Sequence, residues 1–162
     1  MSLRTILTQG DPALAKTCRP VEKFDQKLHE LLDDMKETLV QANGVGLAAP
    51  QIGILRRVVV VMDAEDNMVE LVNPQIIASA GEQTGLEGCL SVPGKYGVVT
   101  RPATATVRAQ DRDGNFFEMS GEGIVARCFC HELEHLDGHL FVEHTDRLYT
   151  VEELEAMEDE KA

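Results

Sequence analysis

The stretch 124–136, Ile-Val-Ala-Arg-Cys-Phe-Cys-His-Glu-Leu-Glu-His-Leu, has apolar residues at helical spacing. Asp137-Gly138 follows it directly and predicts the end of the helix. Within the stretch, Ile124, Cys128, His131 and His135 follow one another at intervals of four, three and four residues, which places them on one helical face. We therefore expect both histidines to point toward the side of the helix that the apolar residues bury.

The segment His131-Glu132-Leu133-Glu134-His135 has the H-E-x-x-H pattern of metal-binding helices. Two histidines one helical turn apart can bind one ion, and imidazole nitrogens favour Zn²⁺, Fe²⁺, Co²⁺ or Ni²⁺ over Ca²⁺ and Mg²⁺. Glu132 points in a different direction and suits a general base for metal-bound water. A catalytic site needs a third protein ligand, for which a downstream carboxylate and a cysteine thiolate are both candidates.

The segment Glu87-Gly88-Cys89-Leu90-Ser91 offers such a thiolate, because the glycine leaves the backbone free to present it. This segment, the upstream Gly44-Val45-Gly46-Leu47-Ala48-Ala49-Pro50-Gln51 and the H-E-x-x-H segment together resemble, in the same order, the three signature motifs of peptide deformylase. The resemblance extends over nearly the whole chain to about Phe141 and leaves only the acidic tail outside it.

The resemblance implies that Cys89, His131 and His135 bind the metal ion, natively Fe²⁺ in this family and replaceable by Ni²⁺, Co²⁺ or Zn²⁺. The implied reaction removes the formyl group from the N-terminal formylmethionine of newly synthesised polypeptides and releases formate. Glu132 would take a proton from the metal-bound water as the water attacks the formyl carbonyl. It would then pass that proton to the leaving amine.

The same resemblance assigns oxyanion donors and substrate contacts. The side-chain amide of Gln51 and the backbone N–H of Leu90 would stabilise the oxyanion together with the metal. Main-chain groups of three residues would hydrogen-bond the extended peptide substrate: Val45, Gly46 and Gly88. The methionine side chain would enter an apolar pocket, although plain core packing explains its proposed lining residues equally well: Val45, Leu90, Ile124 and Cys128.

Three features depart from the family pattern. Glu134 stands where the family usually has Asp, at a position that would support the helix rather than bind the metal. Tyr96 stands where some members have an Arg near the downstream part of the peptide, so recognition there is expected to differ. Some members carry a longer C-terminal helix used at the ribosome, so the short acidic tail here leaves only transient ribosome contact as an expectation.

Together with the resemblance, the remaining periodicities predict an α+β fold. Small mixed, mainly antiparallel sheets would wrap around the central metal-binding helix, with an N-terminal helix and a short C-terminal helix. The N-terminal helix is indicated by apolar residues at helical spacing, with Asp25 as its cap and Asn43-Gly44 as its stop: Leu28, Leu31, Leu32, Met35 and Leu39. We expect one catalytic domain over residues 1–162, of which about 145–162 form the acidic tail.

Several strands are expected between the two longer helices. The β-branched run 57–62 predicts a buried strand, and 70–72 a second one that Asn73-Pro74 ends. The glycine-rich region 81–97 predicts mostly turns and loops. Residues 104–109 and 116–119 flank Asp113-Gly114 and predict a hairpin. Thr150 opens a capping box with Glu153, so a weakly docked helix is expected in the tail.

The composition excludes some classes of partner. Fifteen Lys and Arg against twenty-eight Asp and Glu give a formal net charge of −13, so direct binding of nucleic acid is not expected. No stretch has the length and apolarity of a signal peptide core or a membrane span, so a cytoplasmic protein without membrane contact is expected. In a reducing compartment the four cysteines are expected to form no disulfide.

Two other functions are compatible with parts of this pattern. A zinc endopeptidase of the H-E-x-x-H type would use a downstream carboxylate such as Glu143 in place of Cys89, but the chain is small for that class. A catalytically silent homologue could keep the Cys-His-His set as a structural metal clamp, but it would need neither Glu132 nor Gln51.

Overall fold

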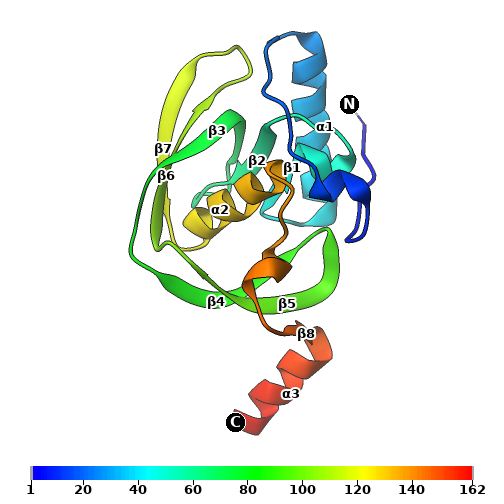
Figure 1. The fold of residues 1–162 in the computed structure, drawn as a ribbon, viewed down its shortest axis with the longest axis vertical. Coiled ribbons are helices and arrows are strands. Elements are labelled where there is room, and N and C mark those ends of the chain that lie inside the picture. Colours follow the sequence, from blue (N-terminus) through cyan, green and yellow to red (C-terminus); the bar gives the residue numbers. More distant parts are fainter. Residues whose placement is uncertain (1, 162) are drawn as a thin grey trace.

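The computed structural model describes residues 2–161 and consists of two antiparallel sheets around a central helix (Figure 1). The helices are α1 (Gln26–Ala42), α2 (Ile124–Leu136) and α3 (Val151–Lys161), with short 3-10 turns at Pro12–Ala15, Ala49–Ile52 and Phe141–His144. The strands are β1 (Gly46–Ala48), β2 (Val58–Met62), β3 (Met68–Ala80), β4 (Gln83–Cys89), β5 (Val92–Arg101), β6 (Thr104–Gln110), β7 (Phe116–Glu122) and β8 (Leu148–Thr150). This mixed α+β architecture with antiparallel sheets confirms the predicted fold class.

The two sheets differ in size and in strand order. The larger has the order β1-β2-β3-β6-β7, and the smaller has the order β4-β5-β8. All paired strands within them run antiparallel. Consequently β1 and β4 each lie at the edge of a sheet, with one side of the backbone free to pair with another segment.

Helix α1 begins and ends where the sequence predicts. The Asp25 carboxylate accepts a hydrogen bond from the backbone N–H of Leu28 at 3.1 Å, which satisfies one free donor of the first turn. Asn43 ends the helix in the left-handed conformation with φ 55°. The apolar face of α1 is buried against one face of the larger sheet, as the amphipathic pattern requires.

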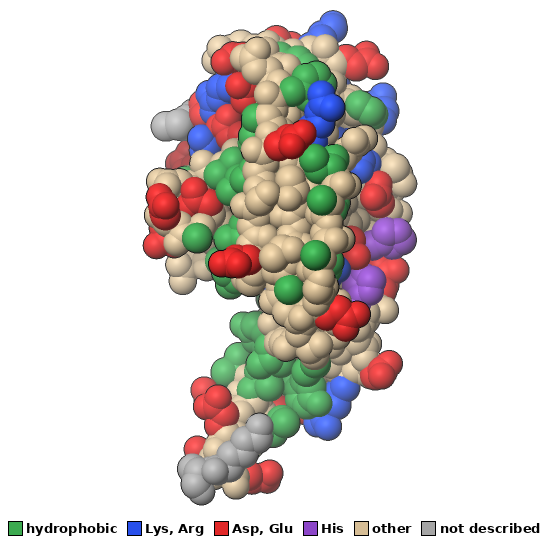
Figure 2. All heavy atoms as spheres, turned by 90° about the vertical axis from the view of Figure 1, so that its left-hand side faces the viewer, with side chains coloured by type: hydrophobic (Ala, Val, Ile, Leu, Met, Phe, Trp, Pro, Cys, Tyr) green, Lys and Arg blue, Asp and Glu red, His purple; other side chains and the backbone are tan. Residues whose placement is uncertain are grey.

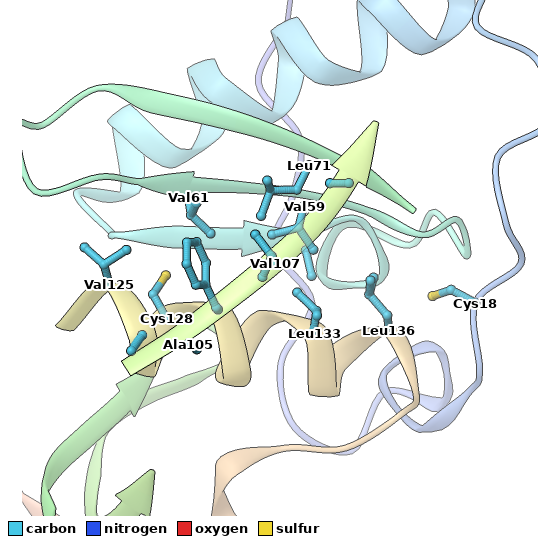
Figure 3. Close-up of a cluster of buried hydrophobic side chains, with 14 residues drawn as sticks. Cys18, Val59, Val61, Leu71, Ala105, Val107, Val125, Cys128, Leu133 and Leu136 are labelled. Carbon is cyan, nitrogen blue, oxygen red and sulfur yellow. The ribbon is translucent and has the colours of Figure 1, made fainter. Parts of the chain in front are cut away.

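The run of four valines in β2 is apolar because both faces of the larger sheet are covered. Val58 and Val60 belong to the core cluster that includes the leucines of α1. Val59 and Val61 point to the opposite face, where they pack with the apolar residues of α2 (Figure 3). Because side chains alternate along a strand, only a strand buried on both faces needs such a continuous run.

Two expectations about the strands were wrong. The glycine-rich region 81–97 forms most of the β4–β5 hairpin rather than loops, with Gly85 opposite Val99 in the ladder. Close packing requires glycine at two of these positions, since a Cβ at Gly88 would lie 2.7 Å from the Tyr96 ring and a Cβ at Gly97 would lie 2.6 Å from Cγ2 of Thr145. Asn73-Pro74 does not end a strand, because β3 continues through an irregularity at which the Asn73 side chain hydrogen-bonds the backbone N–H and C=O of Val21.

The C-terminal part leaves the body of the molecule, and Figure 2 shows it projecting below with hydrophobic side chains at its root. Thr150 caps this helix as predicted, because the backbone N–H of Glu153 donates to Oγ1 of Thr150 at 3.1 Å, while the Glu153 carboxylate accepts from the Thr150 hydroxyl at 3.3 Å. Helix α3 is exposed along nearly its whole length. No helix within residues 2–161 is both long enough and apolar enough to cross a membrane.

Candidate active site

Three ligand-type side chains converge between the two sheets. Cys89 ends β4, and His131 and His135 lie one turn apart on α2. Sγ of Cys89 lies 3.3 Å from Nε2 of His135, which lies 3.2 Å from Nε2 of His131. One ligand atom from each residue falls within 4.8 Å of the other two, and both histidines are buried. A thiolate and two imidazoles at this separation are a donor set for one borderline or soft divalent metal ion.

Glu87 orients His131 from behind. Its Oε2 lies 2.7 Å from Nδ1 of His131, so the imidazole can donate there and leave Nε2 facing Cys89 and His135. Burial alone would raise the pKa of Glu87, but hydrogen bonds from His131 and Arg101 outweigh it and lower the pKa to about 2. Glu87 therefore stays ionised and holds one tautomer of His131.

Two buried arginines hold Glu87 in turn. Nε and a terminal nitrogen of Arg101 contact the Glu87 carboxylate at 3.1 and 2.6 Å, and Arg127 donates to it at 2.9 Å. Arg101 also pairs with Glu134 at 2.8 Å, and His144 lies 2.8 Å from the other oxygen of that carboxylate. The position occupied by Glu134 therefore supports α2 through Arg101 and does not enter the ligand set.

The charges around the ligand atoms favour a cation there. Burial lowers the pKa of His131, but Glu132, Cys89 and Glu87 together raise it well above its usual value. In contrast, burial and the neighbouring His131 lower the pKa of His135 to about 3, so His135 stays neutral and able to ligate. A group of side chains that stabilises positive charge in a buried position fits a divalent cation.

Glu132 lies beside the ligand set, and its carboxylate is buried. Oε2 lies 3.9 Å from Nε2 of His131, and Oε1 has no hydrogen-bond partner among the described residues. Burial raises the pKa of Glu132 to about 7. A carboxylate with this pKa can both accept and return a proton at neutral pH. Gly46 gives it room, because a Cβ there would lie 2.7 Å from Oε2 of Glu132.

Gln51 lies in the 3-10 turn after β1, with its amide held at both ends. Its Oε1 accepts the backbone N–H of Ala48 at 2.8 Å, so its NH₂ group faces the site. This Nε2 donates to Oγ of Ser91 at 3.1 Å and lies 3.6 Å from Sγ of Cys89. The side-chain NH₂ group is thus a fixed donor beside the ligand atoms.

A cavity of about 470 Å³ opens onto this site. Its walls include the edge strands β1 and β4, the turn after β4 and the first turns of α2. Of the residues predicted to act on substrate, all line it: Val45, Gly46, Gln51, Gly88, Leu90, Ile124, Cys128 and Glu132. Ile124 is 64% exposed and lies at the rim, so it does not share the buried face of α2 as expected. Residue 124 is on the first turn, where α2 emerges from the core.

Comparison with known proteins identifies the family. The family model for polypeptide deformylase matches residues 3–151. The chain belongs to the polypeptide deformylase family. It is 57% identical to the peptide deformylase of Agathobacter rectalis over 143 residues, covering 88% of this chain and 90% of that protein. It is 46% identical to peptide deformylase 1 of Bacillus subtilis over 159 residues, covering 98% of this chain and 99% of that protein.

Solved structures of peptide deformylases share the fold. The crystal structure of the Legionella pneumophila enzyme has a TM-score of 0.85 and 41% identity, covering 98% of this chain and 97% of that one. The Ehrlichia chaffeensis enzyme in complex with actinonin has a TM-score of 0.87 and 34% identity, covering 99% of this chain and 97% of that one. This deformylase family member is accordingly an enzyme, as the resemblance of its three motifs implies.

The geometry also bears on the alternatives for the third ligand. Glu143 pairs with His139 at 3.1 Å and accepts the backbone N–H of Leu140, so it is held outside the ligand set. Cys130 is half-buried on α2 and Cys18 is buried against the end of that helix. All four cysteines are free thiols in the structure. The carboxylate alternative therefore has no geometric support.

Sequence reasoning missed the residues behind the ligands. Arg101 and Arg127 lie 14 and 40 residues from Glu87 in the chain, and no local pattern links them to it. The only sequence signal was that Arg127 stands among apolar residues in the first turns of α2, and Arg101 at the end of β5 carried none. Ser91 and Leu86 also face the site or its cavity and were not assigned.

Proposed function

We propose that this enzyme removes the formyl group from the N-terminal formylmethionine of newly synthesised polypeptides and releases formate. The observation that carries the proposal is the convergence of Cys89, His131 and His135 beside the buried carboxylate of Glu132. A structural metal clamp has no use for a buried carboxylate next to its ligands that has a pKa of about 7 and one oxygen, Oε1, without a hydrogen-bond partner among the described residues.

Cys89, His131 and His135 would hold one divalent ion, Fe²⁺ in the proposed native state, with Ni²⁺, Co²⁺ or Zn²⁺ as substitutes. The ion would supply Lewis acidity, which lowers the pKa of water and polarises a carbonyl group. Thiolate ligation makes the site sensitive to oxidation, since the sulfur itself can be oxidised.

The residues around the ligands supply the proton transfer and the oxyanion donors. Oε1 of Glu132 accepts a proton from the attacking water and returns it to the amine that leaves. The NH₂ group of Gln51 and the backbone N–H of Leu90 donate to the oxygen that becomes negative on the formyl carbon. Burial of Glu132 and Gln51 removes competing solvent, which strengthens both interactions.

The edges of the two sheets provide a place for the peptide. Val45 and Gly46 lie at the edge strand β1, and Gly88 lies in the edge strand β4, so an extended peptide between them can hydrogen-bond main-chain groups on both sides. The methionine side chain would pack on Leu90, Cys128 and the rim residue Ile124. Tyr96 lines the same cavity and would contact the downstream residues of the peptide.

The substrate places the enzyme in the cytoplasm, where formylmethionyl polypeptides are made. Contact with the ribosome would be transient, because the net charge of −13 repels ribosomal RNA and α3 is dominated by acidic residues. The functional partner is thus the nascent chain itself, bound without direct recognition of nucleic acid.

One experiment tests the reaction and the roles together. The protein is purified anaerobically, its metal content is measured, and formate release from a formyl-Met peptide is followed alongside cleavage of an unformylated peptide. Glu132→Ala should keep the metal and lose turnover by about a thousandfold or more, whereas Cys89→Ala should lose metal affinity. Internal cleavage without formate, or metal retention in Cys89→Ala, would contradict the proposal.

A further inference from the structure

A second cavity lies at the beginning of α1, whereas the cavity of the deformylase site includes Asn43 and Gly44 after the end of that helix. Its volume is about 640 Å³, and it is lined by Arg4, residues 19–23, Asp25, Lys27, Leu28, Leu31, Ile54 and Arg56. It shares no lining residue with the cavity of the deformylase site. Neither the proposed reaction nor the peptide path uses it, so its composition calls for a separate explanation.

The cavity gathers positive charge on an acidic protein. Five cationic side chains line it, against two carboxylates, Glu22 and Asp25: Arg4, Arg19, Lys23, Lys27 and Arg56. The whole chain has only 15 Lys and Arg and a net charge of −13. One third of its cations therefore surround a single cavity, where like charges repel one another unless an anion is bound.

Four of these cations are free of acidic partners. Arg4 is occupied, since it pairs with Asp34 at 2.8 Å. Within residues 2–161, the remaining four form no salt bridge: Arg19, Lys23, Lys27 and Arg56. Asp25 uses its carboxylate to cap α1 and is thereby turned toward the helix backbone. Glu22, the other carboxylate of the cavity, forms no salt bridge among the described residues, so the four free cations can turn to an external anion.

Four apolar side chains also line the cavity, and we call them its floor and the four free cations its rim. Val21 and Leu28 are buried, and Leu31 and Ile54 are half-buried. An inorganic anion would leave this floor uncovered, whereas a molecule with a flat organic part and a phosphate would use both the floor and the rim. A volume of about 640 Å³ accommodates one nucleotide.

We propose that this cavity binds a nucleoside polyphosphate, with its phosphates on Arg19, Lys23, Lys27 and Arg56 and its base on the apolar floor. A nucleic acid strand offers the same phosphate chemistry but extends beyond the cavity onto a surface with a large excess of carboxylates. That repulsion favours the small ligand over the strand.

The test uses the full chain and a fluorescent ATP analogue at about 50 mM salt, where screening of the rim charges is modest. Arg19→Gln/Lys23→Gln removes two rim charges whose side chains are exposed, and leaves the backbone hydrogen bonds of Arg19 in place. The matched control is Lys16→Gln/Arg108→Gln, which removes one Lys and one Arg from exposed positions outside the cavity. Competition with unlabelled ATP, inorganic triphosphate and an oligoadenylate RNA defines the ligand.

We expect saturable binding with one ligand per chain, at least about tenfold weaker in the rim variant, unchanged within about twofold in the control variant and weakened by added salt. ATP should compete better than inorganic triphosphate, because only ATP covers the floor. Failure to saturate, or equal losses in the two variants, would overturn the site. Equal competition by inorganic triphosphate would overturn the nucleoside part, and binding of the RNA without binding of ATP would assign the phosphates to a strand and overturn the small ligand.

Discussion

Gly46→Ala tests whether the position of the Glu132 carboxylate controls turnover. A Cβ at residue 46 would lie 2.6 Å from Sγ of Cys128 and 2.7 Å from Oε2 of Glu132. The backbone there cannot retreat easily, because β1 is paired with β2 in the register Gly46 opposite Val61. The two side chains must therefore give way.

The size of the displacement follows from contact distances. Non-bonded contacts of carbon settle near about 3.5–4.0 Å, so the carboxylate must move by roughly 1 Å. A displacement of about 1 Å in a reacting group costs on the order of 100-fold in rate, which we expect mainly in kcat. The stability cost should be small, about 1 kcal/mol, because the clashing atoms are side-chain ends rather than backbone.

The assay is formate release at saturating formyl-Met peptide, with metal content and thermal unfolding measured on the same samples. Gly85→Ala is the matched control, since this strand glycine would place its Cβ 3.7 Å from a terminal nitrogen of Arg127, an ordinary contact. Cys128→Ala combined with Gly46→Ala should recover stability but not kcat, because the contact with Glu132 persists. The reasoning fails if Gly46→Ala keeps kcat within about threefold of the parent value. It also fails if the control Gly85→Ala loses as much kcat as we expect for Gly46→Ala.

Two further predictions concern charged groups. Glu87→Gln should lower metal affinity by about 10–100-fold, because a neutral amide no longer fixes the tautomer of His131. Competition with a chelator measures the metal affinity. Unchanged affinity would refute the proposed role of Glu87 in orienting His131. Partial burial of Glu70 would raise its pKa, yet its pairs with Arg112 and Lys36 outweigh this and lower its pKa below the ordinary 4.5. Its stabilisation is therefore present above about pH 4.5 and is lost as the pH falls through the lowered pKa. Glu70→Gln should lower the free energy of unfolding by about 1 kcal/mol at pH 7, as denaturant titrations would show. The free energies of unfolding at pH 7 and pH 3 should also differ less than in the parent. If they differ as much as in the parent, Glu70 does not carry this pH dependence.

Local patterns predicted the helices and the β2 strand well. In α1 the cap by Asp25, the apolar spacing and the stop at Asn43 all act within a few residues, so the chain specifies this helix locally. The prediction of loops for residues 81–97 was wrong because the conformation there depends on contacts with distant residues. Glycines there indicated turns, but Gly88 and Gly97 lie in strands, where Tyr96 and Thr145 respectively occupy the space that a side chain would need. Those partners become neighbours only after the sheet has formed.

In the candidate site, too, contacts between neighbouring residues of the chain were predictable and contacts between distant residues were not. The sequence by itself determined that His131 and His135 share one face of a helix with Glu132 beside them, because helical neighbours lie within four residues of each other. Only the tertiary structure decided that Cys89 rather than Glu143 lies beside the two histidines, at a separation of 46 residues from His135. It alone also placed Arg101 and Arg127 behind Glu87. Such contacts depend on how two sheets pack around α2, and side chains far apart in the chain carry no local pattern that records this packing.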